Sequence, residues 1–343
     1  MTTSDPFTFT QSELERVLEE HHDELFDRTR DVDDSPEKPA SPELEPAPKL
    51  LIVAGVQGSG KTYLLENTLL PSNKYANYVP LYKTEYRTWH PRYRDMQGMN
   101  ALDIYAHTES FIWALGHRIM SYALANKYNI IMESALDSLG FASFPNHAVN
   151  AGYRFEVHLI GCKRDFAHLS TIRRGLKSAS LDELERFVSV AEIDQSVTNA
   201  EAILNAFEDA CTKVTGSRIT LYERGFGALR DRKVLCSSLC ESPMTLTPQP
   251  LRTASGELVQ PDSLPARIER TAERNKPCSY REYLKLINTG FDSQERQEAV
   301  AEAQASLQAL SMIDQYRIPT AIRTGVAQNL QSYIERYSAS VAR

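Results

Sequence analysis

A glycine-rich stretch near residue 60 constrains the fold of this chain more than any other feature. The apolar run LLIVA at residues 50–54 is typical of a buried strand, and GVQGSGKT follows directly at residues 55–62. This matches G-x-x-x-x-G-K-[ST], the pattern of a phosphate-binding loop, and a helix-like segment follows at residues 63–69. The glycines let several backbone N–H groups point at one anion, and the helix N-terminus adds partial positive charge. The stretch therefore predicts a site for a nucleotide polyphosphate.

The side chains of the loop have distinct expected roles. Lys61 should reach the β- and γ-phosphates, and the hydroxyl of Thr62 should ligate Mg²⁺. The expected cofactors are therefore ATP or GTP together with Mg²⁺. The residues expected to bind the nucleotide are Gly55, Gly58, Ser59, Gly60, Lys61, Thr62 and Tyr63.

Composition narrows the class of protein. The chain has 343 residues, 42% of them hydrophobic, which is ample for a large core. Its five cysteines show no zinc-ligand spacing, and no apolar run reaches the ~18 residues of a membrane span. With a polar, acidic N-terminus unlike a secretory signal, these features predict a cytoplasmic protein with reduced thiols and no membrane partner. Residues 1–48 hold 14 acidic and 4 basic side chains, so the remainder is nearly neutral, which argues against nucleic-acid binding.

Four regions follow from changes in pattern along the chain. Residues 1–30 carry apolar positions at helical spacing among acidic side chains, which predicts an amphipathic helix with a regulatory or a docking role. Residues 31–48 are rich in proline and acidic residues, as in a linker. Residues 49–237 are expected to form the domain that contains the phosphate loop, and residues 238–343 a mostly helical C-terminal region.

Strand-like and helix-like segments alternate within residues 49–237. Such alternation predicts an α/β fold with a mainly parallel sheet flanked by helices, and ligands at the carboxyl ends of the strands. Besides residues 50–54, strands are expected at 78–82, 128–133, 154–162 and 218–222, and helices at 103–127, 165–177 and 181–214. Residues 223–260 are expected to be irregular, and further helices are expected at 263–274, 279–288, 293–312 and 319–337.

A phosphoryl-transfer site also needs a carboxylate near Mg²⁺ and cations for the transferred charge. Glu133 ends the apolar run NIIME and suits the first need, although it also reads as an ordinary strand-end carboxylate. Residues 84–94 are dense in cations and aromatic rings, which suits either a nucleotide-like acceptor or a solvated loop. Arg173 and Arg174 lie on a predicted helix, from which an arginine either swings onto the phosphoryl group or faces solvent.

With these segments in place, the chain resembles the zeta toxin family, which are P-loop kinases related to chloramphenicol phosphotransferase. The resemblance covers about residues 50–235. Its most specific part is YRTWHP at 86–91, similar to the family's aromatic–basic–x–x–His–Pro segment. It also rests on GVQGSGKT, NIIMES at 129–134, HLSTIRRG at 168–175, VTNAEAIL at 197–204 and ITLYER at 219–224.

The resemblance implies an activity and a partner. Zeta toxins use ATP to phosphorylate a sugar hydroxyl of UDP-N-acetylglucosamine or related UDP-sugars, and an epsilon-type antitoxin blocks the nucleotide site with a helix. Residues 49–237 would then be a zeta-toxin-like P-loop kinase domain, and the chain would be the toxin of a toxin–antitoxin system. The positions that match the family's functional residues are Lys61 and Thr62 in the loop, Glu133 at the strand end, Arg174 in the lid helix and Arg87 before His-Pro.

The chain departs from the family on the acceptor side. The family's general base is an aspartate three residues before Arg87, but this position is Thr84, which cannot accept a proton at neutral pH. Glu85 is the nearest carboxylate, and His117 stands where an acidic substrate contact is expected. The expected catalytic residues are therefore Lys61, Glu85 and Arg174. The expected acceptor contacts are Thr84, Arg87, His90, His117 and Glu133, and the expected metal ligands are Thr62 and Glu133.

Three functions stay open at this point. The first is an active kinase for a UDP-sugar. The second is a zeta-like kinase for NAD or another nucleotide, as in bacterial effectors, because positions 84, 117 and 137 differ from the family. The third is a nucleotide-binding protein with impaired transfer, because Thr84 replaces the aspartate. Inhibition would come from a separate antitoxin protein or from the N-terminal helix of the same chain.

Overall fold

The computed structural model describes residues 6–27, 47–225, 232–252 and 256–338. The linker expected at residues 31–48 therefore lies almost entirely outside the described residues. Within the described ranges, no helix is long and apolar enough to cross a membrane.

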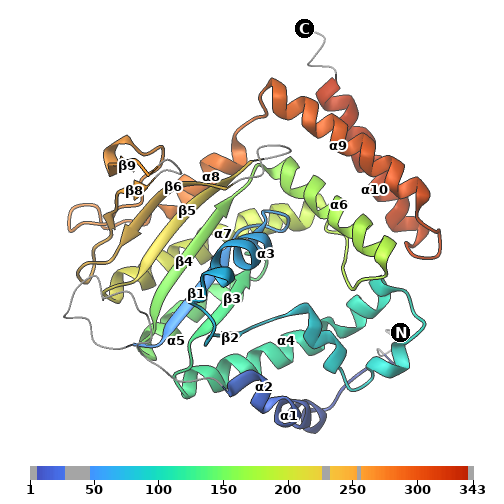
Figure 1. Cartoon of the computed structure of the whole chain (residues 1–343), viewed down its shortest axis with the longest axis horizontal. Helices are drawn as coiled ribbons and strands as arrows, with labels where there is room; N and C mark the ends of the chain where they lie inside the picture. Colours follow the sequence, from blue (N-terminus) through green and yellow to red (C-terminus); the bar gives the residue numbers. More distant parts are fainter. Residues whose placement is uncertain (1–5, 28–46, 226–231, 253–255, 339–343) are drawn as a thin grey trace.

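The centre of the molecule is a seven-stranded sheet with the order β2-β3-β1-β4-β5-β6-β7 (Figure 1). Neighbouring strands from β2 to β5 in this order are parallel, whereas β6 and β7 are antiparallel additions at one edge. The expected α/β fold with a mainly parallel sheet is confirmed. The strands are β1 Lys49–Ala54, β2 Val79–Pro80, β3 Ile130–Ser134, β4 Arg154–Gly161, β5 Arg218–Arg224, β6 Arg232–Leu239 and β7 Thr247–Pro248.

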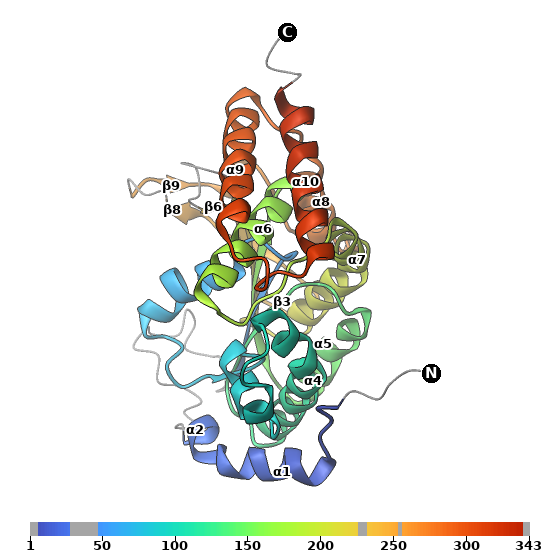
Figure 2. The same ribbon diagram turned by 90° about the vertical axis from the view of Figure 1, so that its right-hand side faces the viewer.

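Helices cover both faces of the sheet, with α3 on one face and α4, α5 and α7 on the other (Figures 1 and 2). The helix after the phosphate loop begins as an α-helix and continues as a π-helical turn over Leu65–Leu69. The helices around the sheet are α3 Lys61–Leu64, α4 Ala101–Ala125, α5 Phe144–Asn150, α6 Arg164–Leu181, α7 Val190–Lys213 and α8 Ser279–Asn288.

Strand β1 lies between β3 and β4 and is buried on both faces. Leu50 and Ile52 belong to the core shared with α4, α5, α7 and α8. Leu51 and Val53 point the other way, into a second core under α3. All four side chains are completely buried. Burial on both sides explains why this strand reads as a continuous apolar run instead of an alternating one.

The N-terminal amphipathic helix forms as expected, with a break at His21 between α1 Gln11–Glu20 and α2 His22–Phe26. Both helices dock on α4, as Figures 1 and 2 show. The ring of His21 stacks on Trp89 at 3.7 Å, and Phe26 packs on Tyr122 of α4. An ion pair of 2.8 Å joins Glu13 to Arg92. Residues of α1 and α2 thus pack against α4 and the residues before it.

The C-terminal region combines helices with extended segments. Helix α8 and the hairpin of α9 Ser293–Met312 and α10 Thr320–Ser338 confirm the helices expected there, and Figure 2 shows the hairpin beside α6. The helix expected at residues 263–274 is wrong. Arg270 and Leu246 exchange both backbone hydrogen bonds, at 3.0 and 3.1 Å, so the backbone there is bridged to another segment and not coiled. Strand β6 and the short strands β8 Leu251–Arg252 and β9 Leu258–Val259 also lie in the part expected to be irregular.

Candidate active site

The phosphate loop leaves β1 at the carboxyl edge of the sheet. The Gly55 N–H still donates to Ser134 of β3 at 3.1 Å, and the chain then turns through Gly58 and Gly60 with φ angles of 77° and 88°. These left-handed conformations favour glycine. A Cβ atom on Gly58 would also clash with the backbone carbonyl of Ala167 in α6. The loop is therefore packed directly against α6, and no larger residue fits at position 58.

Lys61 folds back over the loop and is almost completely buried. Its Nζ donates to the carbonyl oxygens of Gly55 at 2.9 Å and Val56 at 3.1 Å. Burial lowers the pKa of Lys61 to about 8, although the carboxylate of Glu133 acts in the opposite direction. A desolvated ammonium group that donates to two neutral carbonyl groups gains strongly from a nearby phosphate. The arrangement suits the role expected for this lysine.

Thr62 and Glu133 meet beside the loop. Parallel pairing of β1 and β3 sets Glu133 opposite Val53, and the Thr62 hydroxyl donates to the Glu133 carboxylate at 3.0 Å. Burial raises the pKa of Glu133. A hydroxyl and a carboxylate in contact are ligand types that Mg²⁺ takes beside a nucleotide. No cluster of three or more metal-binding side chains occurs in the described ranges, so an ion here would take its other ligands from phosphate and water.

The remaining loop side chains differ in their surroundings. Ser59 is completely buried, and its hydroxyl has no hydrogen-bond partner among the described residues. Gln57 donates to Asp137 and accepts from Ser196, both at 3.1 Å. Tyr63 is more than half exposed on α3. A buried hydroxyl without a partner suits a loop that receives a polar ligand.

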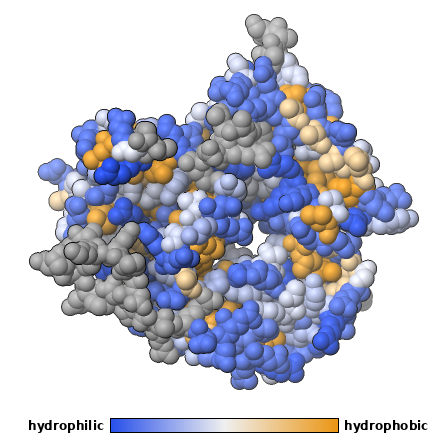
Figure 3. Space-filling model, in the orientation of Figure 1, coloured by the Kyte–Doolittle hydropathy of each residue, from blue (hydrophilic) through white to orange (hydrophobic). Residues whose placement is uncertain are grey.

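The two arginines of α6 point to different parts of the molecule. Arg174 forms an ion pair of 2.8 Å with Glu185, and its charge lowers the pKa of both Lys61 and Glu133. Arg173 instead pairs with Glu302 of α9 at 3.4 Å. Of the two, Arg174 is the cation near the loop. Figure 3 shows that the surface is hollowed between α3, α4 and α6, and a small molecule could reach the phosphate loop through this hollow.

Residues 34–232, more than half of the chain, match the family model described as Zeta toxin. The chain belongs to the zeta toxin family. Among curated proteins, Toxin PezT of Streptococcus pneumoniae serotype 4 (strain ATCC BAA-334 / TIGR4) is 23% identical over 128 residues, which are 37% of this chain and 50% of that protein. The chain thus spans about half the length of the curated relative it matches.

Solved structures share the fold at low sequence identity. A chain from the PezAT chromosomal toxin–antitoxin system of Streptococcus pneumoniae superposes with a TM-score of 0.54 at 17% identity, covering 90% of this chain and 98% of that one. A chain from the AvrRxo1-ORF1:AvrRxo1-ORF2 complex with sulphate ions gives 0.52 at 13% identity, covering 96% and 88%. The chain therefore shares its fold with these proteins.

The segment where this member of the zeta toxin family departs from the family pattern is a 3₁₀-helix over Thr84–Trp89. Thr84 and Glu85 are both exposed, and the Glu85 carboxylate pairs with Lys83, the residue that precedes this helix. A strand would turn these two neighbouring side chains to opposite faces, but a 3₁₀-helix does not. Glu85 therefore lies on the outside of a short turn and has room to move.

The other expected acceptor residues are less accessible or point elsewhere. Arg87 is 4% exposed and binds Glu109 of α4 at 2.6 Å, with its guanidinium over the Tyr105 ring. His90 is buried, with its ring against Phe111 and its Nδ1 accepting from a backbone N–H. His117 is exposed on α4. Arg87 is therefore held against α4, and it meets Glu109 there.

Sequence reasoning missed an aromatic face of α4. Tyr82, two residues beyond the end of β2, lies at the same carboxyl edge as Glu133 and has a left-handed φ of 57°. Its ring packs 5.3 Å from that of Trp113, which is 44% exposed and donates to Glu109 at 3.2 Å. A side chain on Gly116 would clash with the Tyr82 ring. A glycine inside a helix, three residues after an exposed tryptophan, was the signal available in the sequence.

Two more contacts to the loop backbone come from residues far along the chain. Arg224 at the end of β5 donates to the carbonyl oxygen of Gly58, and Tyr283 of α8 accepts from the Val56 N–H. Neither position could be linked to the loop by a local pattern, because more than 160 residues separate the partners.

Proposed function

We propose that this protein uses ATP to phosphorylate a sugar hydroxyl of UDP-N-acetylglucosamine or another UDP-sugar, and that it acts as the toxin of a toxin–antitoxin system. The observation that carries the proposal is the group formed by Lys61, the Thr62–Glu133 pair and Arg174 around one point of the sheet edge. Family membership supports the kinase chemistry, and the named residues supply its charges.

Each group has a defined role in this proposal. Lys61 would leave its two carbonyl partners and bind the β- and γ-phosphates, while Thr62 and Glu133 hold the metal. Mg²⁺ supplies positive charge that neutralises the phosphate oxygens. Arg174 would leave Glu185 and stabilise the charge that develops on the transferred phosphoryl group. These residues bind and orient the nucleotide phosphates, since phosphoryl transfer depends mainly on positioning and electrostatics.

The acceptor hydroxyl loses its proton when its oxygen bonds to phosphorus, so a base must lie within reach. We propose Glu85 for this role, because its exposed carboxylate is tied only to Lys83 in the described contacts. The aromatic pair of Tyr82 and Trp113 supports an acceptor that carries a planar base, since such rings stack readily. A UDP-sugar has that shape.

The residues expected to contact the acceptor also support a second and a third candidate function. NAD also carries planar bases and sugar hydroxyls, so the same aromatic pair suits it. The threonine at position 84 and the exposed, lysine-paired Glu85 favour a protein that binds nucleotide but transfers poorly.

One experiment separates these candidates. The purified chain is incubated with ATP, Mg²⁺ and a panel of UDP-sugars, NAD and nucleosides, and products are searched by mass for one added phosphate, with Lys61→Ala as the blank. A UDP-sugar product supports the first proposal, and an NAD product replaces it with the second. Tight ATP binding without any product contradicts transfer, and activity that appears only in Thr84→Asp assigns the defect to that position.

We also propose an inhibitor protein as the partner. The structural relatives come from a toxin–antitoxin system and from a two-protein complex, which supports a partner in trans. Docking of α1 on α4 leaves little support for inhibition from within the chain, because that helix lies on the side of α4 away from α3 (Figures 1 and 2). Copurification with the product of a neighbouring reading frame, and loss of ATP binding in that complex, is the corresponding test.

A further inference from the structure

Helix α8 reaches the phosphate loop from outside the part of the chain that matches the family. The backbone N–H of Val56, the second residue of the loop, donates to the hydroxyl of Tyr283 at 3.1 Å. Tyr283 is completely buried and is among the largest such side chains in the described structure. The two residues are 227 positions apart, so this contact exists only in the folded chain.

The contact acts on a peptide unit that Lys61 also binds. The carbonyl of Gly55 and the N–H of Val56 belong to one planar peptide group. Lys61 Nζ donates to that carbonyl at 2.9 Å, and Tyr283 accepts from that N–H. The peptide plane is therefore held from both sides. Without the tyrosine hydroxyl, this peptide plane is free to rotate. Because Lys61 donates to its carbonyl oxygen, the position of the Lys61 ammonium group would then change as well.

Helix α8 is itself fixed in place by a buried carboxylate. Glu208 of α7 is completely buried and accepts from the N–H groups of Cys278 and Ser279, the closest contact being 2.7 Å. A negative charge at a helix N-terminus is stabilised by the N–H groups there. Farther along, a Cβ atom on Gly161 of β4 would lie 2.8 Å from Cβ of Leu286, so α8 packs directly on the strand backbone.

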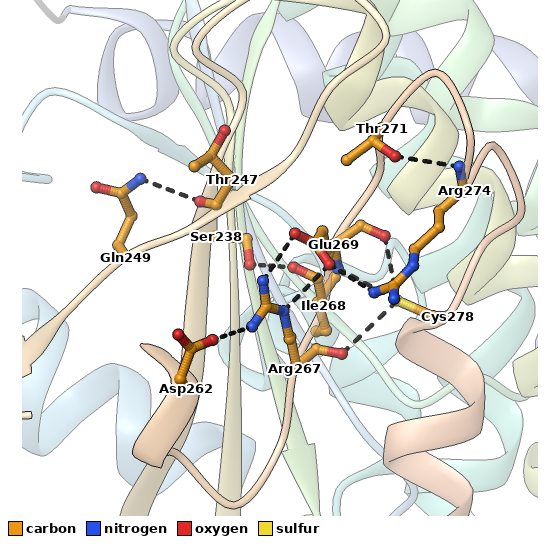
Figure 4. A network of polar contacts seen from close by, with 10 residues as sticks. All are labelled: Ser238, Thr247, Gln249, Asp262, Arg267, Ile268, Glu269, Thr271, Arg274 and Cys278. Carbon is orange, nitrogen blue, oxygen red and sulfur yellow. Dashed lines mark hydrogen bonds and ion pairs between the residues drawn. The ribbon is translucent and has the colours of Figure 1, made fainter. Parts of the chain in front are cut away.

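The segment that leads into α8 is also held by polar contacts, which Figure 4 shows. Glu269 accepts from Arg267 at 2.8 Å and from Arg274 at 2.9 Å. The hydroxyl of Ser238 in β6 donates to the Ile268 carbonyl, which ties the segment to the sheet. These contacts therefore fix the position of α8, so the Tyr283 hydroxyl is already in place before a ligand binds.

We propose that Tyr283 is a positioning residue for the phosphate loop, so that α8 is a working part of the nucleotide site. The inference rests on the proposed nucleotide binding. Its chemistry is limited to one hydrogen bond, which pre-orders the Gly55–Val56 peptide and thereby the loop around it. Ordering one backbone unit only on binding would weaken affinity by about 5- to 10-fold.

The test is Tyr283→Phe, which removes one oxygen atom and keeps the packing of the ring. Two measurements are made: hydrogen exchange of the Val56 amide, and the dissociation constant for ATP by calorimetry. We expect exchange at residue 56 to accelerate about 10-fold or more, and ATP to bind about 5- to 10-fold more weakly. A kcat change without a change in ATP affinity would contradict the inference.

The matched control is Tyr153→Phe. Tyr153 is also completely buried, and its hydroxyl donates to the carbonyls of Ala123 and Tyr128 at the other end of the sheet. This variant should lose stability while exchange at residue 56 and ATP affinity stay as in the parent. If both variants weaken ATP binding equally, the effect is global and the inference fails. If the parent chain does not bind ATP at all, the proposed function fails, and exchange at residue 56 alone decides the role of Tyr283.

Discussion

Lys61 shows how much of this site can be derived from single residues. The motif predicted its place, and the apolar run that ends in Glu133 predicted a carboxylate near the metal that Thr62 would ligate. The structure adds that the lysine is desolvated, with a pKa lowered to about 8 by burial. By contrast, no local pattern indicated that Arg87 is buried against Glu109, because this depends on how a 3₁₀-helix faces α4.

The lowered pKa of Lys61 predicts a pH dependence of ATP binding. The protonated ammonium binds phosphate, so the affinity for ATP should fall as pH rises through about 8. Calorimetry between about pH 7 and about pH 9.5 checks this. Lys213→Ala, on the far end of α7, should keep the profile of the parent chain. A flat profile across this range would show that the lysine stays charged.

The same burial predicts that Lys61 destabilises the ligand-free protein. At pH 7, below the folded pKa, the ammonium is charged and desolvated, so Lys61→Met should raise the free energy of unfolding by about 1–2 kcal/mol. The unfolded chain keeps its proton up to about pH 10, so the parent chain should regain stability as pH rises from about 8 toward that value. Urea unfolding checks both statements. Lys213→Met should leave stability nearly unchanged, and a destabilised Lys61→Met would contradict the prediction.

The choice of base gives a third prediction at this scale. If Glu85 takes the acceptor proton, Glu85→Gln should lower kcat by about 10²- to 10⁴-fold. ATP affinity should stay unchanged, because Glu85 has no contact with the loop in the described structure. The kinetic assay uses whichever acceptor the panel identifies, with Glu201→Gln at an exposed position of α7 as the control. An unchanged rate in Glu85→Gln would move the role to another carboxylate, such as Glu109, which accepts a hydrogen bond from Trp113 of the aromatic pair.

At the scale of elements, α1 illustrates what periodicity can and cannot predict. Its apolar face was read correctly, and Leu14 and Val17 are buried. Its binding surface was not predicted, because α4 has apolar or aromatic side chains on several sides. The helix expected at residues 263–274 failed for a related reason. Arg270 is drawn into the interior by Glu208 and Asp209, and this tertiary contact overrides the local preference.

Docking of α1 and α2 predicts the effect of removing them. Deleting residues 1–27 would expose the surface of α4 that Leu14, Val17, Leu25 and Phe26 now cover. We expect the free energy of unfolding to fall by roughly 2–4 kcal/mol, with ATP affinity within about twofold of the parent. Thermal unfolding and calorimetry provide the two readouts. Tighter ATP binding or higher activity in the shortened chain would instead support inhibition by this helix.

At the scale of the whole molecule, the C-terminal hairpin covers the outer side of α6. His168 of α6 bonds to the hydroxyl of Tyr333 in α10 at 2.7 Å, and Arg336 pairs with Asp165 at 2.9 Å. Because α6 also contacts the loop at Gly58, the hairpin and the loop share one support. The helices of this hairpin were predictable from their own periodicity. Their place against α6 was not, because it depends on contacts across more than 160 residues.

This interface predicts a loss of stability in acid. Burial lowers the pKa of His168, while Asp165 acts to raise it and Arg164 to lower it. The folded protein thus resists protonation, and stability should decline as pH falls below about 6.5. Urea unfolding at several pH values should show a shallower decline in His168→Gln. His147→Gln, at an exposed position of α5, should follow the parent, and equal slopes in all three chains would contradict the prediction.

The position of α8 also bears on how this protein should be produced. A gene fragment that ends where the family match ends, at residue 232, would encode most of the sheet but neither α8 nor the segment that anchors it. In its product, the surface of β4 at Gly161, which Leu286 of α8 now covers, would be exposed. The backbone N–H of Val56 would also lose the Tyr283 hydroxyl that accepts its hydrogen bond. For expression and crystallisation, the shortest fragment that retains an intact loop should therefore extend to about residue 290, just beyond Asn288.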